Sequence, residues 1–331
     1  MPKVLTTGEL LIDFSPVQIP RYKNLLCPNP GGAPANVAVQ LSRLGVSSGF
    51  IGKVGRDDFG AQLRACLDEN HVSIKNLIVD PAWKTTLAFV QLDASGNRSF
   101  TFYRNPGADT QLKPEEIDLS ELESCSILHF GSLALTTDPS RTTTLWLVKK
   151  AREMGKLISY DPNWRPPLWP SEKEGIEGMK LGLPLCDMLK ISDEEIRLIT
   201  GEQSLQKGVD QLHALGIRLI VVTLGPCGCA YSLGNGLTHQ PTFDTKVVDT
   251  TGSGDSFWGG LLSRIVKGGF DTQEALARMD EKTLGEYCRF GNGAGSACAA
   301  FPGGIPALQD EESILRCMES TPLLETDDAD L

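Results

Sequence analysis

The chain reads Asp249-Thr250-Thr251-Gly252-Ser253-Gly254-Asp255-Ser256-Phe257 between an apolar run and an amphipathic one. Before it, the β-branched bias of residues 245–248 predicts a strand. After it, Phe257, Leu261 and Ile265 recur at helical spacing. A strand would then enter a helix through a turn whose glycines leave the backbone N–H groups uncovered. Such N–H groups, aided by the helix dipole, form a site for an anion such as phosphate.

Asp255 is the acidic residue of this turn, and no Lys or Arg stands beside it in the sequence to cancel its charge. A carboxylate there can take the proton from an attacking hydroxyl, while the N–H groups of Gly252, Ser253 and Gly254 hold the developing charge. This combination suits phosphoryl transfer. The alternative is a tight turn with an acidic helix start, because Gly and Asp are common turn and cap residues.

A family resemblance favours the first interpretation. The stretch resembles the C-terminal motif of the ribokinase-like, or PfkB, carbohydrate kinases, with Ser253 where the family usually has Ala. A second family motif lies far upstream, at Gly31-Gly32-Ala33-Pro34-Ala35-Asn36-Val37-Ala38. The two motifs stand in the right order, and the similarity extends from Gly8 to about Leu308.

The composition is that of a globular, acidic protein. Its 331 residues are 40% hydrophobic and 22% charged, enough for a sizeable core. The net charge of −11 argues against nucleic acid or an anionic membrane as the main partner. Nine cysteines without a CxxC pair fit the reduced thiols of a cytoplasmic protein. We also expect no signal peptide and no membrane span.

From Ile127 onward, short apolar runs alternate with helical stretches. This alternation predicts an α/β fold with a doubly wound, mostly parallel sheet and helices on both faces, which is the ribokinase-like architecture. Ligands of such sheets bind beyond the carboxyl ends of the strands, so residues that follow apolar runs should converge there. These residues are Asp13, Asp161, Ser192, Gly225 and Gly252.

Two β-rich segments near the N-terminus are expected to form a small lid. They span about residues 15–30 and 84–104, and the second reads as a hairpin around Ala94-Ser95-Gly96-Asn97. A first strand is expected over residues 4–14. We expect residues 1–320 to form one kinase domain that carries the lid, with an acidic, frayed tail at residues 321–331.

The first motif and its surroundings imply a sugar site. Asp13 follows an apolar run, and its carboxylate can accept hydrogen bonds from two vicinal hydroxyls, although a turn residue would look the same. Gly31 and Gly32 allow the backbone to approach a ligand closely. Asn36 offers a donor and an acceptor at a helix start, where Asn also serves as a cap.

Three further residues are assigned to the sugar pocket by resemblance alone. Their segments are similar to those of the fructokinase and 2-keto-3-deoxygluconate kinase branch of the family, in which they line the pocket. Without the resemblance, isolated arginines are usually solvated surface residues. The three are Arg104, Asn163 and Arg165.

The resemblance also places nucleotide and Mg²⁺ contacts. Residues Ser192 to Glu195 are similar to the family's Asn-x-x-Glu motif, although Ser192 lacks the usual amide. Glu195 is implied to act through a magnesium-bound water, since Mg²⁺ keeps much of its hydration. An acidic helix start would look the same. The implied ATP-binding residues are Ser192, Glu195, Thr223, Gly225, Gly228 and Asn292.

Asp249, Thr251 and Gly303 match the place where the family binds a monovalent cation such as K⁺.

The motifs of other nucleotide-binding families are missing from the sequence. It contains no Walker A lysine motif, no GxGxxG and no His-Arg-Asp loop, and its four histidines lack metal-ligand spacing.

These observations predict an ATP-dependent sugar kinase, most similar to a fructokinase. Asp255 would deprotonate the primary hydroxyl of fructose, which would attack the γ-phosphate of MgATP. One alternative is a 2-keto-3-deoxygluconate kinase, whose acid substrate would pair with Arg104 or Arg165. Another is a catalytically silent sugar-binding sensor, against which the intact Gly252–Gly254 turn and Asp255 argue.

The family often pairs lids between subunits, so we expect a homodimer.

Overall fold

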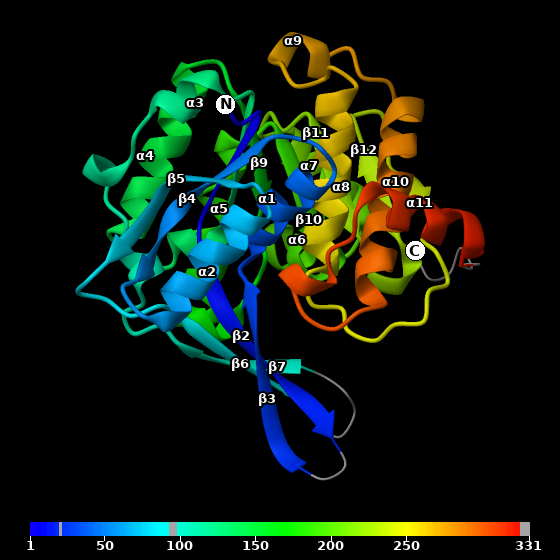
Figure 1. Cartoon of the computed structure of the whole chain (residues 1–331). Helices are drawn as coiled ribbons and strands as arrows, with labels where there is room; N and C mark the ends of the chain where they lie inside the picture. The colour runs from blue at the N-terminus through cyan, green and yellow to red at the C-terminus, as the bar shows by residue number, and fades with distance from the viewer. Residues whose placement is uncertain (20–21, 93–97, 325–331) are drawn as a thin grey trace.

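The computed structural model describes residues 1–19, 22–92 and 98–324. A nine-stranded sheet forms its centre, in the order β13-β12-β11-β10-β9-β8-β1-β4-β5 (Figure 1). Every neighbouring pair is parallel except that β12 runs antiparallel to both β11 and β13. The strands are β1 (Val4–Thr7), β4 (Ser48–Gly55), β5 (Ser73–Asp80), β8 (Ile127–Gly131), β9 (Leu157–Asp161), β10 (Met188–Ser192), β11 (Leu219–Thr223), β12 (Cys229–Ser232) and β13 (Thr238–Gln240).

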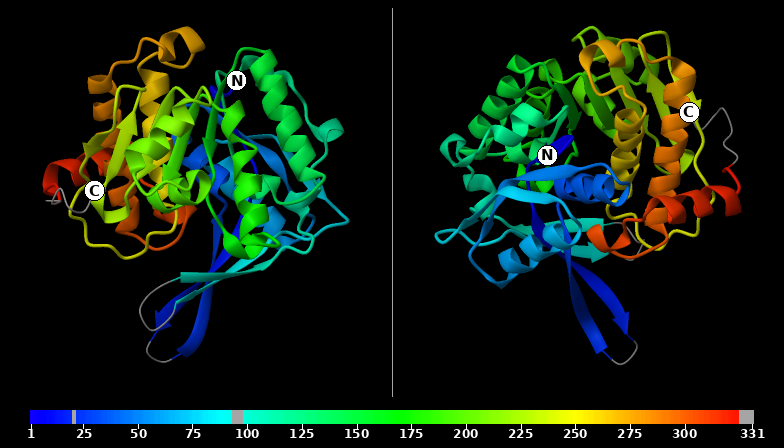
Figure 2. Two further views of the ribbon diagram at one scale, coloured as in Figure 1. Left: turned by 180° about the vertical axis from the view of Figure 1, so that it is seen from behind. Right: turned by 45° about the horizontal axis from the view of Figure 1, so that its top comes forward.

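Helices cover both faces of this sheet (Figure 2). Side chains alternate between the faces along each strand. Leu128 of β8 packs in the cluster that contains side chains of α4, α5, α6 and α7, whereas its neighbour Ile127 packs with those of α1, α8 and α10. The helices are α1 (Ala33–Arg43), α2 (Asp58–Glu69), α3 (Ser120–Ser124), α4 (Ser140–Glu153), α5 (Glu172–Lys180), α6 (Asp193–Thr200), α7 (Leu205–His213), α8 (Ser253–Lys267), α9 (Gln273–Leu276), α10 (Glu281–Ala299) and α11 (Glu311–Ser320).

A second, four-stranded sheet projects from the body and forms the lid (Figures 1 and 2). Its strands are β2 (Leu11–Ile19), β3 (Tyr22–Gly31), β6 (Leu87–Leu92) and β7 (Arg98–Tyr103), in the order β3-β2-β6-β7. The doubly wound sheet with a small β lid, expected from the sequence, is thus confirmed. The expected hairpin turn at residues 94–97 lies outside the described residues, as do residues 325–331 of the expected tail.

The first strand differs from the expectation of one element over residues 4–14. The chain leaves the large sheet at Thr7 and enters the lid at Leu11, so two strands belong to two sheets. Gly8 makes the passage with φ of 150°, and a Cβ there would lie 2.7 Å from Cγ of Pro34. The site residue Asp13 therefore belongs to the lid, where it pairs with Asn29 of β3.

The strand expected at residues 245–248 is absent from the described structure. Val247 and Val248 are 60% and 57% exposed, and the N–H groups of Val248 and Asp249 both donate to the carbonyl of Ala299 at the end of α10. β-Branched residues favour a strand only where a neighbouring strand and a packing surface exist. The motif that begins at Asp249 therefore enters α8 from a loop.

Within the described residues, no helix combines the length and the apolar character needed to cross a bilayer.

Candidate active site

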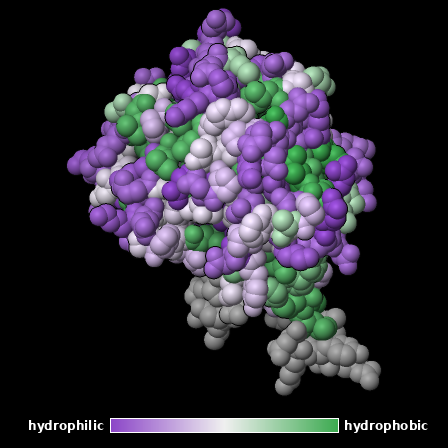
Figure 3. Space-filling model, turned by 90° about the vertical axis from the view of Figure 1, so that its left-hand side faces the viewer, coloured by the Kyte–Doolittle hydropathy of each residue, from purple (hydrophilic) through white to green (hydrophobic). Residues whose placement is uncertain are grey.

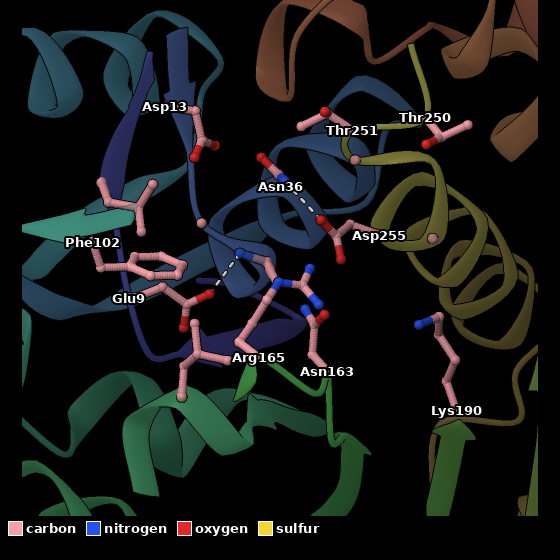
Figure 4. A pocket seen from close by; sticks show the side chains of 16 residues that line it. Glu9, Asp13, Asn36, Phe102, Asn163, Arg165, Lys190, Thr250, Thr251 and Asp255 are labelled. Atoms are coloured by element: carbon pink, nitrogen blue, oxygen red, sulfur yellow. Dashed lines mark hydrogen bonds between the residues drawn. The ribbon is translucent and has the colours of Figure 1, made fainter. Parts of the chain in front are cut away.

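Two adjoining cavities lie at the carboxyl edge of the large sheet, and the lid contributes to the wall of the smaller one. The smaller has a volume of about 290 Å³, near the lower end of the usual range for small-ligand sites (Figure 4). It is lined by Glu9, Leu11, Asp13, Gly32, Ala33, Asn36, Phe102, Leu133, Asn163, Arg165, Lys190, Thr250, Thr251, Gly252, Gly254 and Asp255.

The larger cavity has a volume of about 530 Å³. It shares Thr250 and Gly254 with the smaller one, so the turn before α8 lies between the two. Four of the residues expected at the nucleotide line its wall, together with the shared turn: Thr223, Gly225, Gly228 and Asn292.

The start of α8 meets the requirements for an anion site. Gly252 is its N-cap with a left-handed φ of 79°, and no side chain of the described residues caps the helix there. The N–H of Ser253, expected to hold the developing charge, already donates to the carbonyl of Thr250, and the N–H of Ser256 donates to the carbonyl of Gly252. N–H groups of a first helical turn lack partners within the helix, and the dipole makes this end positive. Phosphate oxygens would satisfy these groups.

Asp255 lies in the first turn of α8 and is buried. Its Oδ2 accepts a hydrogen bond of 2.7 Å from Nδ2 of Asn36, which fixes the carboxylate toward the smaller cavity (Figure 4). Burial raises the pKa of Asp255 to about 6, against the lowering effects of the Asn36 hydrogen bond and of Lys190. A carboxylate with this pKa is ionised at neutral pH and basic enough to accept a proton.

Lys190 brings a buried positive charge to the same place. Its Nζ lies 2.7 Å from Oδ2 of Asp161, and both side chains are buried. A Cβ on Gly254 would lie 3.4 Å from this Nζ, so the ammonium sits beside the turn before α8. Burial would lower the pKa of Lys190, but Asp161 and Glu195 outweigh it, and the pKa is raised. The lysine is therefore charged.

Asp13 reaches the smaller cavity from the lid. A Cβ on Gly31 would collide with its Oδ2, so the glycine is required for this carboxylate to fit. Burial raises the pKa of Asp13 to about 7, against the opposing charge of Arg165. Arg165 and Asn163 line the opposite wall after β9, and Asn163 has a positive φ of 53°.

Arg104 differs from the expectation that it lines the sugar pocket. Its Nε donates to Oδ2 of Asp109 at 2.7 Å, and its terminal nitrogens donate to Thr136 Oγ1 and the carbonyl of Leu133. The guanidinium is buried behind the cavity, because Asp109 is a buried carboxylate that needs a counter-charge. Arg104 thus supports the wall residue Leu133.

Ser192 and Glu195 form a capping box at the start of α6. Ser192 Oγ accepts from the N–H of Glu195, and Glu195 Oε2 accepts from the N–H of Ser192. Glu195 Oε1 accepts from the N–H of Trp164 at 2.5 Å, between Asn163 and Arg165. Through Glu195, the start of α6 is therefore hydrogen-bonded to the chain segment that forms one wall of the smaller cavity.

Asn292 and the expected cation residues also lie near the turn. Asn292 Nδ2 donates to the carbonyls of Gln240 and Pro241. Asp249 accepts from the N–H of Thr251 through Oδ1 at 2.8 Å and from the N–H of Gly303 through Oδ2 at 3.0 Å. One carboxylate thus joins the loop before α8 to the loop after α10.

Glu9 and Lys190 are wall residues that the sequence interpretation missed. A charged residue inside the apolar run of residues 188–191 was the available signal for Lys190. Glu9 follows Gly8 directly, but nothing in its sequence surroundings distinguishes it from a turn residue.

A buried carboxylate beside an uncapped helix start, with a cavity on each side, is the arrangement of a kinase that phosphorylates a small alcohol. The chain belongs to the pfkB family of carbohydrate kinases, because the sequence model of that family matches residues 1–311.

Individual relatives agree with this assignment. The chain is 39% identical to Fructokinase-1 of Zea mays over 324 residues, which cover 96% of this chain and 97% of the relative. It is similar to the structure of fructokinase with bound ATP from Xylella fastidiosa, with a TM-score of 0.89, 30% identity and coverage of 97% and 99% of the two chains. A double mutant of fructokinase from Vibrio cholerae O395, bound to fructose, ADP and potassium ion, gives a TM-score of 0.85 and 32% identity, covering 96% of this chain and 98% of the other.

Proposed function

We propose that this protein is an ATP-dependent fructokinase that converts fructose to fructose 6-phosphate. The observation that carries the proposal is the position of Asp255, buried at the turn that the two cavities share. The relatives named above are fructokinases, and two of their structures hold a nucleotide or a nucleotide with fructose.

In this proposal the sugar occupies the smaller cavity and ATP the larger. Asp255 accepts the proton of the primary hydroxyl of the sugar. At the same time the oxygen of that hydroxyl forms a bond to the γ-phosphorus of ATP. The bond from that phosphorus to the β–γ bridging oxygen breaks, and ADP leaves. The N–H groups at the start of α8 and the ammonium of Lys190 face the charge on the transferred group. Asn36 orients the base.

Magnesium is compatible with these residues as a companion of ATP. Among the residues that the structure describes, no three His, Cys, Asp or Glu side chains cluster as a metal site, so phosphates and water would supply most ligands. Each carboxylate oxygen of Glu195 accepts one backbone N–H and retains a lone pair for a magnesium-bound water. The ion would neutralise charge on the phosphates when bound.

Fructose is expected to be preferred over 2-keto-3-deoxygluconate by at least tenfold in kcat/KM. Three buried carboxylates (Glu9, Asp13 and Asp255) and two cations (Arg165 and Lys190) line the smaller cavity. Lys190 is already paired with Asp161, so above about pH 7 an acid substrate would meet an excess of like charge. Arg104, a candidate partner for that acid, is already paired with Asp109. A coupled assay of ADP formation with a panel of sugars and MgATP in excess measures the preference.

Two results of this assay would contradict the proposal in different ways. A tenfold preference for the acid, about 1.4 kcal/mol at the transition state, would overturn the fructose assignment and leave the kinase mechanism standing. Sugar binding without ADP formation for any sugar would instead indicate a silent sensor.

Potassium is expected to activate the enzyme. Asp249 places a carboxylate between the loops that carry Thr251 and Gly303, and a monovalent cation held by oxygen atoms of these loops would brace the turn before α8. Replacing a large organic cation by K⁺ at constant ionic strength should raise kcat roughly threefold to tenfold, the effect of about 1 kcal/mol. A flat titration would rule the cation site out.

A homodimer through the lid is the expected assembly. Val17, Leu26 and Tyr103 of the small sheet are 37%, 42% and 65% exposed, and apolar surface gathers on the projecting part of the molecule (Figure 3). β3 and β7 are the edge strands of that sheet, and exposed apolar edges are usually covered. Sedimentation velocity at micromolar concentration should show a dimer that Leu26→Lys weakens. A clean monomer of the unmodified chain would contradict this expectation.

A further inference from the structure

Glu9 stands where the chain passes from the large sheet to the lid, between β1 and β2. It is only 2% exposed, yet it lines the smaller cavity. Its Oε1 accepts a hydrogen bond of 2.8 Å from the N–H of Ala33, at the start of α1 (Figure 4). This contact fixes the carboxylate and satisfies one N–H at the start of α1, whose N-cap residue, Gly32, has no side chain to do so.

The second oxygen of Glu9 has no hydrogen bond of normal geometry to any described residue, although the N–H of Glu9 itself acts on the carboxylate. This oxygen, Oε2, is a buried polar atom. The charge of Arg104 lowers the pKa of Glu9, but the nitrogens of Arg104 donate to Asp109, Thr136 and Leu133. A buried acceptor left unpaired is costly, and natural structures rarely keep one without a reason.

The cavity supplies the reason. A polyol presents hydroxyl donors in several directions, and an unpaired carboxylate oxygen in the wall is the complement of one such donor. In Figure 4 the side chain of Arg165 lies between Glu9 and Asp255. Burial raises the pKa of Glu9 to about 7, against the lowering effects of hydrogen bonds from the N–H groups of Glu9 and Ala33. Because Glu9 and Asp255 lie on different sides of Arg165 in this view, we expect Glu9 to meet a hydroxyl other than the one that Asp255 deprotonates.

We propose that Glu9 is a specificity-determining residue, whose Oε2 accepts a hydrogen bond from a non-reacting hydroxyl of the sugar. The proposal rests on the function proposed above and deepens it, because it assigns part of the recognition to a residue outside the two family motifs. The hydrogen bond from Ala33 holds the first oxygen, which leaves the second for the sugar.

The test is a cross of enzyme variants with substrate analogues. Glu9→Gln keeps an oxygen for the N–H of Ala33 and replaces the second oxygen, an acceptor, by an NH₂ group, a donor. The analogues are 1-deoxy-, 3-deoxy- and 4-deoxyfructose, and 2,5-anhydromannitol, which lacks the C2 hydroxyl. Steady-state kinetics give KM and kcat for each pair, and Glu121→Gln is the control, a buried glutamate outside the cavity whose two oxygens accept from Ser73 and Asn76.

With the unmodified enzyme at pH 8, above the pKa of about 7 of Glu9, one analogue should lose about 10- to 100-fold in kcat/KM, mainly through KM, as for a hydrogen bond to a charged group. Glu9→Gln should raise the KM for fructose by a similar factor, leave the KM for ATP unchanged and no longer distinguish that analogue from fructose. Glu121→Gln should retain the full discrimination.

Three outcomes would overturn the inference. The unmodified enzyme could treat all four analogues like fructose. Glu9→Gln could lower kcat/KM equally for fructose and every analogue, as a merely structural residue would. Glu9→Asp, used if the Gln variant does not fold, could keep the unmodified pattern. An enzyme without sugar-dependent ADP formation would overturn the proposed function instead, and calorimetric titration of Glu9→Gln with the sugar that binds the unmodified protein would then decide the role of Glu9.

Discussion

Asp255→Asn is expected to lower kcat at least about 100-fold, since general base catalysis typically contributes ~10²- to 10⁴-fold. The amide keeps the size of the side chain and can still meet Asn36, but it cannot take a proton. The KM for the sugar should change little, because the interaction lost belongs to the transition state. Coupled assays at saturating ATP and sugar measure the effect. A variant with nearly normal kcat would exclude Asp255 as the base.

The pH dependence provides a second signature of the same residue. Burial raises the pKa of Asp255 to about 6, and the base works only when ionised, so kcat should fall tenfold per pH unit below about pH 6. Asp13, with a pKa of about 7, adds a second acid-side transition to kcat/KM. Asp255→Asn should abolish the fall of kcat below about pH 6. Asp310→Asn is the matched control, because Asp310 is an exposed N-cap of α11 and Asn caps equally well.

The parts of this protein that could be predicted from the sequence are those whose signal is local. The alternating pattern after Ile127 predicted the parallel sheet, because strands buried on both faces are short continuous apolar runs. The glycine-rich turn before Asp255 predicted an uncapped helix start, because only glycine takes the φ of 79° found at Gly252 without strain.

The parts that could not be predicted depend on contacts between distant segments. The β-branched residues 245–248 have strand propensity, but the carbonyl of Ala299, which is distant in sequence, takes the N–H of Val248. Arg104 resembles a pocket residue by its position, yet the buried carboxylate of Asp109 binds its guanidinium. A sequence does not reveal which of several nearby groups an arginine will meet.

Lys190 was missed for the same reason. A lysine inside the apolar run of residues 188–191 signals a buried charge, but only the fold shows that its partner is Asp161, at the end of the neighbouring strand β9 and 2.7 Å from its ammonium. Asp161 and Lys190 are 29 positions apart in the sequence, and they meet because their strands are neighbours in the sheet. No local sequence pattern contains the order of strands in a sheet.

Lys190→Met is expected to lower the free energy of unfolding by about 3–5 kcal/mol, because it leaves the carboxylate of Asp161 buried and without its cation. One oxygen of Asp161 already lacks a hydrogen-bond partner among the described residues. Loss of the Lys190 ammonium would therefore remove a partner from a carboxylate that has too few. Urea denaturation followed by circular dichroism measures the change, with the m-value checked for constancy. The variant should also lose kcat, since Lys190 lies beside Gly254 at the proposed phosphoryl position.

A double-mutant cycle separates these two effects. Asp161→Asn combined with Lys190→Met removes both charges, so the double variant should be more stable than Lys190→Met alone, and the coupling energy measures the ion pair. Its kcat should stay low, because the amide restores the packing but supplies no positive charge to the transferred phosphoryl group. If stability and kcat recovered together, the lysine would serve only to neutralise Asp161. If the two substitutions were additive in stability, the buried ion pair would contribute nothing and the expected loss would have another cause.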